Sequence, residues 1–276
     1  MLRTLLILGR VSNLPTVWTN VLAGWFLAGG DWSLEIVWLA AGISLLYVAG
    51  MTLNDAFDAS WDREHAPERP IPSGAIAERT VWTIGFAQMI AGMAVLLVST
   101  RAAWPWVAGL VAAILLYDRL HKKTAAAIVV MGACRALVYL AAASALAKTI
   151  PTPVWWWSGG MLIYVAGITL AAKGERTGGA LPWVARVLLA APLIAIFSKS
   201  IATGLFASFM WMSFVFSPSF RMKTGEISMG RFVGGLIAQI ALLDGLIVED
   251  LSVVALVVCI GSLVLAFLLQ RKIPAT

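Results

Sequence analysis

Charged residues are scarce in this sequence. Asp, Glu, Lys and Arg make up 12% of its 276 residues, whereas 61% are hydrophobic and the mean hydropathy is +0.89. A soluble domain carries about 25% charged residues, so the composition excludes an ordinary soluble enzyme. The 20 basic residues outnumber the 14 acidic ones, but this excess suits membrane topology and nothing in it indicates a nucleic-acid partner. We expect a single domain over residues 1–276.

Cysteine and histidine are almost absent. Cys134 and Cys259 lie in separate apolar runs, where cysteine behaves as a small hydrophobic residue, so neither a disulfide nor thiol chemistry is expected. His65 and His121 are too few to argue for a transition-metal site. The first ten residues lack a signal-peptide cleavage site, and we expect them to be retained.

Long apolar runs dominate the sequence. A helix needs about 20 residues to cross ~30 Å of hydrocarbon, and in a bilayer every backbone polar group must be hydrogen-bonded within the protein. We therefore predict an all-α, polytopic membrane bundle of nine or ten transmembrane helices, because the boundaries at Ser200 and Asp250 are weak. The runs are 14–30, 35–54, 81–99, 103–118, 125–147, 154–172, 181–198, 201–218, 230–248 and 251–270.

Basic residues recur in alternate loops between these runs. With ten spans, every cation-rich loop falls on one side, which the positive-inside rule makes cytoplasmic. We therefore expect cytoplasmic termini, a multi-pass protein of the cell inner membrane, and some contact with anionic membrane lipids. The basic residues are Arg3, Arg10, Arg63, Arg69, Arg79, Arg119, Lys122, Lys123, Lys173, Arg176, Arg221, Lys223, Arg271 and Lys272.

The second run ends in a cluster of oxygen-bearing side chains, Asn54, Asp55, Asp58 and Asp62. If the helix continues, these side chains share one face, because successive residues are about 100° apart. Carboxylates so placed repel one another unless a hard cation offsets the charge, and Mg²⁺ uses one or two carboxylates together with waters and phosphate oxygens. The alternative is a solvated helix end, which suits Asp62 with its two charged neighbours better than it suits Asn54 or Asp55.

Prolines follow the cluster, in His65-Ala66-Pro67-Glu68-Arg69-Pro70-Ile71-Pro72-Ser73-Gly74. They exclude a continuous helix and predict an ordered turn on the cytoplasmic side. Arg69 in this turn is placed to approach an anion held by the metal, or it is an ordinary topogenic charge.

The run N-D-x-x-D-x-x-x-D followed by R-P-I-P-S-G resembles the UbiA superfamily of intramembrane prenyltransferases. Residues 9–20, GRVSNLPTVWTN, are similar to that family's first helix, and the resemblance extends from about residue 9 to the ninth run. It implies that Mg²⁺ grips a prenyl diphosphate at Asn54, Asp55, Asp58 and Asp62, with Asp55 and Asp58 catalytic. Asn20 is then expected to be a polar pocket residue.

Further candidates follow the fourth run and lie inside the fifth. The resemblance implies that Tyr117 and Lys122 or Lys123 contact the diphosphate, although the lysines also suit plain positive-inside charges. Arg135 lies within an apolar run, where a guanidinium needs a carboxylate, carbonyl groups or an anion unless it snorkels. We therefore include Arg135 among the substrate-binding candidates.

The resemblance fails after the sixth run. The family carries a second acidic motif there, D-x-x-x-D, for a second Mg²⁺, whereas residues 171–178 read AAKGERTG. Lys173 and Arg176 could instead neutralise a phosphate directly. This pattern is similar to the EboC-type UbiA-like branch, and it predicts one Mg²⁺ rather than two.

We therefore predict a Mg²⁺-dependent membrane transferase that moves a prenyl group from a prenyl diphosphate to an acceptor that the sequence does not identify. The alternative is a non-catalytic binder or transporter of an amphipathic or phosphorylated metabolite, because buried charges mark transport pathways as readily as active sites. The rewritten second motif favours the alternative, and the intact first motif favours the enzyme.

Overall fold

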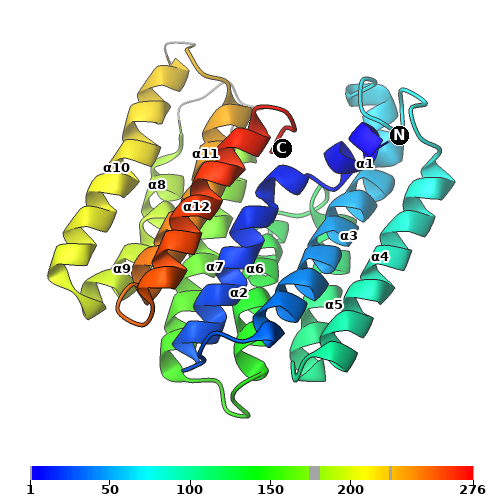
Figure 1. Ribbon diagram of the computed structural model, residues 1–276. Coiled ribbons are helices and arrows are strands. Elements are labelled where there is room, and N and C mark those ends of the chain that lie inside the picture. Colours follow the sequence, from blue (N-terminus) through cyan, green and yellow to red (C-terminus); the bar gives the residue numbers. More distant parts are fainter. Residues whose placement is uncertain (1, 174–180, 224–225, 276) are drawn as a thin grey trace.

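The computed structural model describes residues 2–173, 181–223 and 226–275, and the regular elements of these segments are all helical (Figure 1). Together they form a bundle of roughly aligned helices. The helices are α1 (Leu2–Leu8), the short 3₁₀ turn η1 (Val11–Asn13), α2 (Leu14–Leu27), α3 (Leu34–His65), α4 (Glu78–Ser99), α5 (Trp104–Leu120), α6 (Ala127–Ser144), α7 (Thr152–Lys173), α8 (Trp183–Leu189), α9 (Ala191–Lys199), α10 (Ile201–Lys223), α11 (Met229–Val248) and α12 (Val253–Gln270).

The prediction of an all-helical integral membrane protein is confirmed. Seven described helices are long and apolar enough to cross a bilayer, namely α3, α4, α6, α7, α10, α11 and α12. α2 and α5 have 14 and 17 residues, just short of that length. The weak boundaries at Ser200 and Asp250 do separate distinct helices. The count of nine or ten spans stays a prediction.

The predicted run 181–198 is not one continuous helix, which corrects the sequence analysis. It breaks at Ala190 into α8 and α9, with Pro192 in the first turn of α9. Proline has no N–H to donate, and its ring clashes with the carbonyl four residues earlier. Proline is tolerated in the first turn of a helix, so the chain restarts there instead of continuing.

α2 lies among several neighbours and packs against α6, α11 and α12. Its approach to α6 requires glycine at position 24, because a Cβ there would lie 2.6 Å from the carbonyl oxygen of Tyr139. The close approach also places Asn20, one turn earlier on α2, against the Tyr139 side chain. The polar residues of α2 and α6 are thereby brought together inside the bundle.

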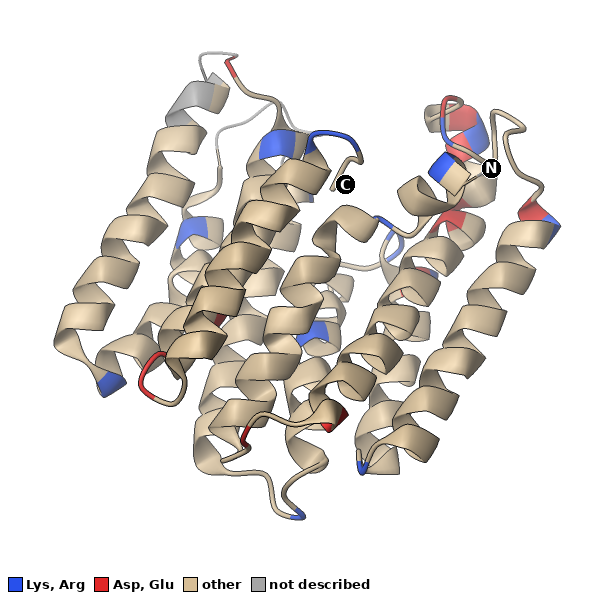
Figure 2. Ribbon diagram, in the orientation of Figure 1, with Lys and Arg blue, Asp and Glu red and all other residues tan. Residues whose placement is uncertain are grey.

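The first and last helices end on one side of the bundle, where the acidic end of α3 also lies (Figures 1 and 2). The opposite end carries the acidic residues of the connections before α3 and after α11, which are red in the ribbon (Figure 2). This arrangement matches the expectation that both termini lie on the side that carries the Asn/Asp motif.

Candidate active site

The polar cluster forms because α3 continues as a helix past its apolar part, as far as His65. Asn54, Asp58 and Asp62 therefore follow one stripe of the helix, and this stripe meets the end of α5. There Asn54 Nδ2 donates a hydrogen bond of 3.1 Å to Asp118 Oδ1, and Lys122 Nζ lies 2.9 Å from Asp58 Oδ2.

The turn after α5 adds further contacts to the same stripe. Lys122 Nζ also lies 3.3 Å from Asp62 Oδ1 and 3.8 Å from the centre of the Trp61 ring. His121 Nε2 lies 3.1 Å from Asp58 Oδ2. Lys123 is exposed, so of the two candidate lysines the structure brings Lys122 to the cluster.

Asp55 lies on the same face of α3, since Arg69 contacts both Asp55 and Asp62, and two arginines approach it. Arg10 Nη2 and Arg69 Nη1 each lie 3.7 Å from Asp55 Oδ1. That oxygen is buried and accepts no hydrogen bond within the described chain. Asp55 therefore presents a desolvated carboxylate oxygen that lies beside two guanidinium groups and can still accept a hydrogen bond or bind a metal ion.

Asp62 differs from its expected solvated setting. It is 1% exposed, compared with 8% for Asp55 and 5% for Asp58. Its charged neighbour Arg63 turns outward and pairs with Glu78 at 2.5 Å. The interpretation of Asp62 as a solvated helix end is therefore wrong, because the proline turn and the end of α5 cover the carboxylate.

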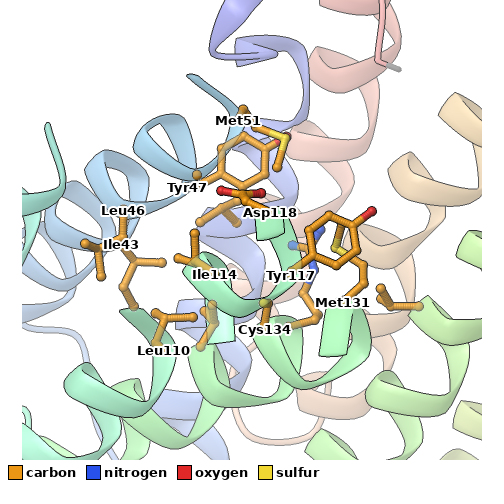
Figure 3. Close-up of a pocket in the computed structure, with 15 residues that line it drawn as sticks. Ile43, Leu46, Tyr47, Met51, Leu110, Ile114, Tyr117, Asp118, Met131 and Cys134 are labelled. Carbon is orange, nitrogen blue, oxygen red and sulfur yellow. The ribbon is translucent and has the colours of Figure 1, made fainter. Parts of the chain in front are cut away.

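An apolar cavity lies beside the cluster, between α2, α3, α5, α6 and α7. Asp118 lies in its wall and links it to Asn54, and Tyr117 lines it while stacking on His121 at 5.1 Å (Figure 3). Most of the remaining wall is apolar: Val17, Ile43, Leu46, Tyr47, Gly50, Met51, Leu110, Ile114, Met131, Cys134, Val138 and Val165.

Tyr47 lines this cavity together with Tyr117. Tyr139 and Tyr164 are fully buried. The Tyr164 hydroxyl group lies 3.0 Å from Gln239 Oε1, within hydrogen-bond distance. Tyr139 belongs to a separate polar network.

That network lies behind Arg135, which lines the cavity. Arg135 Nη1 donates to Asn20 Oδ1. Asn20 Nδ2 in turn donates to Asp244 Oδ2 at 2.6 Å. Asn20 is fully buried, so this predicted pocket residue reaches the cavity through Arg135.

Asp244 is the fully buried centre of the network. Its Oδ2 also accepts from Thr19 at 2.7 Å, and its Oδ1 accepts from Tyr139 at 2.8 Å and Trp157 at 3.1 Å. Four helices, α2, α6, α7 and α11, therefore meet at one carboxylate. Four donors satisfy this intramembrane group, which would otherwise be costly to bury.

The predicted phosphate-binding pair after α7 is only partly described. Lys173 ends α7 and is exposed. Arg176 lies outside the described residues.

The donor set suits one cation better than a closed metal cage. Among the described residues, no three Asp, Glu, His or Cys side chains converge as they do around a protein-bound metal. The acidic residues instead pair with basic ones, and Asp55 Oδ1 accepts no hydrogen bond within the described chain. Mg²⁺ often takes only one or two carboxylates and completes its shell with waters and substrate phosphates. The number of ions stays a prediction.

The sequence analysis missed four polar residues at or near this site. Arg10 was interpreted only as a loop cation. Asp118, which precedes Arg119 and follows Tyr117, was not included among the candidates. His121 was judged only as a metal ligand. Asp244 was hidden in an apolar run, although a carboxylate inside a span is itself a signal of a buried partner.

The fold and this site define a class of protein: an all-helical integral membrane protein with a charged cluster beside an apolar cavity. More narrowly, the chain belongs to the UbiA prenyltransferase family, whose sequence profile matches residues 15–222.

Named relatives are matched over shorter segments. The chain is 31% identical over 91 residues to digeranylgeranylglyceryl phosphate synthase of Methanoregula boonei, a third of each protein. It is 27% identical over 168 residues to 4-hydroxybenzoate octaprenyltransferase of Acidovorax ebreus, covering 59% of this chain and 58% of that one. Both matches span less than two thirds of the relative.

Solved structures share the fold over nearly the whole chain. A UbiA homologue from Aeropyrum pernix K1, solved in its apo form, superposes with a TM-score of 0.68 at 16% identity, covering 89% of this chain and 99% of that one. A UbiA homologue from Archaeoglobus fulgidus, bound to GPP and Mg²⁺, gives a TM-score of 0.61 at 13% identity, covering 95% and 99%.

Proposed function

We propose that the protein is a membrane prenyltransferase that moves a prenyl group from a prenyl diphosphate to an acceptor. The observation that carries the proposal is the buried oxygen of Asp55, which accepts no hydrogen bond within the described chain and lies 3.7 Å from both Arg10 and Arg69, in a cluster that adjoins an apolar cavity. Such a site can hold a diphosphate at its polar end and an isoprenoid chain in its apolar part.

The residues of the cluster have different roles in this proposal, according to their position. Arg10, Arg69 and Lys122 surround the place of the diphosphate, where their charges stabilise the negative charge that develops as the group leaves. Asn54, Asp55 and Asp58 provide oxygen ligands for one Mg²⁺, with Asp62 holding Arg69 and Lys122 in position. When bound, that ion supplies Lewis-acid stabilisation of the diphosphate oxygens.

The transfer breaks the bond between the allylic carbon and the diphosphate oxygen, and the diphosphate leaves with the electron pair. A nucleophilic atom of the acceptor then forms the new bond to the allylic carbon. The acceptor loses one proton, which the released diphosphate takes up. Tyr47 and Tyr117 present aromatic rings to the cavity, where they shield the cationic carbon from water.

Three finer points belong to the same proposal. Lys173 and Arg176 replace the family's second acidic motif in the sequence and would neutralise the diphosphate directly. The site faces the cytoplasm, since the basic loops lie beside it. We place the protein in the cell inner membrane, with nine or ten spans in one domain over residues 1–276.

The test uses the full chain in lipid nanodiscs with radiolabelled geranylgeranyl diphosphate, Mg²⁺ and an extract of membrane metabolites. We expect diphosphate release and a prenylated product detected by mass spectrometry, both abolished by chelation and by Asp55→Asn. Lys123→Gln serves as a matched surface control and should retain wild-type product formation. Mg²⁺-dependent binding without diphosphate release or product would overturn the transferase and favour the non-catalytic binder.

A further inference from the structure

Arg135 is a cation in the wall of the cavity with most of its donors unused. A guanidinium has five N–H donors, and its hydrogen bond to the protein goes to Asn20 Oδ1. No carboxylate lies within ion-pairing distance of it in residues 2–173, 181–223 and 226–275. Its side chain is only partly buried and lines the cavity. The unused donors are therefore available to a bound molecule.

The negative charge that compensates Arg135 belongs to Asp244, and the Asn20 side chain lies between the two groups. Asp244 accepts four hydrogen bonds, two on each oxygen, from Thr19, Asn20, Tyr139 and Trp157. A carboxylate offers about four acceptor positions, so Asp244 has no place left for a direct bond to Arg135. The Asn20 amide connects the two charges by accepting from one and donating to the other. This Arg135–Asn20–Asp244 relay holds the guanidinium in place and leaves most of its N–H donors unused.

Arg135 is also separate from the cations of the Asp cluster. It lies eight residues into α6, about 12 Å along the helix from Ala127 at 1.5 Å per residue. Arg10, Arg69 and Lys122 pair with the acidic residues of α3. The diphosphate end thus has its own cations, and the cavity has a different one, surrounded by Val17, Val138 and Val165.

We propose that Arg135, held by the Asn20–Asp244 relay, binds a carboxylate group of the acceptor, so that the acceptor is an acid with an apolar body. This inference rests on the proposed transferase and names the chemical class of its second substrate. A guanidinium matches a carboxylate with two parallel hydrogen bonds. The rest of the cavity wall is mostly apolar, which suits the apolar body of such an acid. Asp244 acts through Asn20 and is a positioning residue.

The test measures binding to full-length protein in nanodiscs by isothermal titration, with 4-butylbenzoate and its neutral amide as probes. Wild type should bind the carboxylate at least about tenfold more tightly, because a charge-assisted hydrogen bond is worth about 1.5–3 kcal/mol. Arg135→Gln should reduce the carboxylate-to-amide ratio to near one, and Arg135→Lys should give an intermediate ratio. Asp244→Asn should lower the ratio several-fold, while affinity for geranylgeranyl diphosphate changes little in all three variants.

Arg69→Gln supplies the opposite control, since it should weaken diphosphate binding and leave the carboxylate-to-amide ratio intact. Gel filtration and thermal unfolding identify any variant that fails to fold. If Arg135→Gln fails to fold, the carboxylate-to-amide ratio of Arg135→Lys is compared with that of wild type instead. A wild-type ratio near one, or an unchanged ratio in Arg135→Gln, would overturn the proposal. Loss of diphosphate affinity in Arg135→Gln would assign the guanidinium to the diphosphate instead. Carboxylate selectivity without any prenyl transfer would retain this site and reject the transferase.

Discussion

Arg69 and Asp62 form an ion pair across the end of α3, with 3.0 Å between Arg69 Nη1 and Asp62 Oδ2. They are seven positions apart in the sequence, and Ala66, Pro67 and Glu68 between them follow the end of α3. The pair therefore ties the proline turn back onto the helix that precedes it. Lys122 reaches the other oxygen of Asp62 at 3.3 Å, so one buried carboxylate joins α3, the turn after it and the turn after α5.

This arrangement predicts that Asp62 matters as much as Asp58. Asp62→Asn should lower Mg²⁺-dependent affinity for geranylgeranyl diphosphate by about tenfold or more, because each lost charge-assisted bond is worth about 1.5–3 kcal/mol. Asp58→Asn should have an effect of similar size. Isothermal titration at fixed Mg²⁺ measures both. A wild-type affinity for Asp62→Asn would show that Asp62 takes no part in diphosphate binding.

Two adjacent lysines provide a matched pair. Lys122→Gln removes the partner of Asp58 and Asp62, so diphosphate affinity should fall by about tenfold on the same energetic scale. Lys123→Gln removes an exposed charge and should change affinity less than twofold, since isolated surface charges contribute little. Equal losses in the two variants would mean that general positive potential, and not the contact geometry, attracts the diphosphate.

Asp55 predicts how the protein responds to metal removal. Chelation should abolish diphosphate binding in wild type, because Asp55, Asp58 and the two phosphates would otherwise crowd their negative charges together. Asp55→Asn removes one of these charges and should leave weak binding that depends little on Mg²⁺. Titrations with and without a chelator compare the two proteins. Undiminished Mg²⁺ dependence in Asp55→Asn would exclude this carboxylate as a ligand.

The replaced second motif predicts the number of ions. One Mg²⁺ should accompany each bound diphosphate, because Lys173 and Arg176 supply positive charge covalently. Arg176→Lys should lower affinity, since an ammonium cannot grip two phosphate oxygens at once. Metal analysis of the complex gives the stoichiometry. Wild-type binding by both Arg176→Lys and Arg176→Ala would make these charges purely topogenic.

The Asp244 network predicts a cost in stability. Tyr139→Phe leaves Asp244 Oδ1 with Trp157 as its remaining donor, and a buried acceptor that loses a partner costs about 1–3 kcal/mol. Thermal unfolding of the detergent-solubilised protein should show a lower midpoint. Trp156→Phe changes a side chain that is 71% exposed and should leave the midpoint nearly unchanged.

Periodicity and motif were enough to predict the helices and the acidic stripe, because both depend on neighbours along the chain. α3 continues to His65, and Asn54, Asp58 and Asp62 share the stripe that meets α5. The partners across the bundle could not be predicted in this way. Asn20 and Asp244 are 224 positions apart, and nothing local in α11 indicates that α2, α6 and α7 supply its donors. The burial of Asp62 depends likewise on two separate turns.

Because α3 is continuous, it fixes the rotation of the acidic stripe about the helix axis relative to the residues of α3 that face the cavity. Leu46, Tyr47 and Gly50 face the cavity, and Asn54 begins the acidic stripe on the same uninterrupted helix. A substitution at any of these positions leaves that rotation unchanged. A one-residue insertion between Gly50 and Asn54 would turn every later side chain by about 100° and advance it by about 1.5 Å. The stripe would then lose Asp118, His121 and Lys122 together, so this segment can vary in composition but not in length.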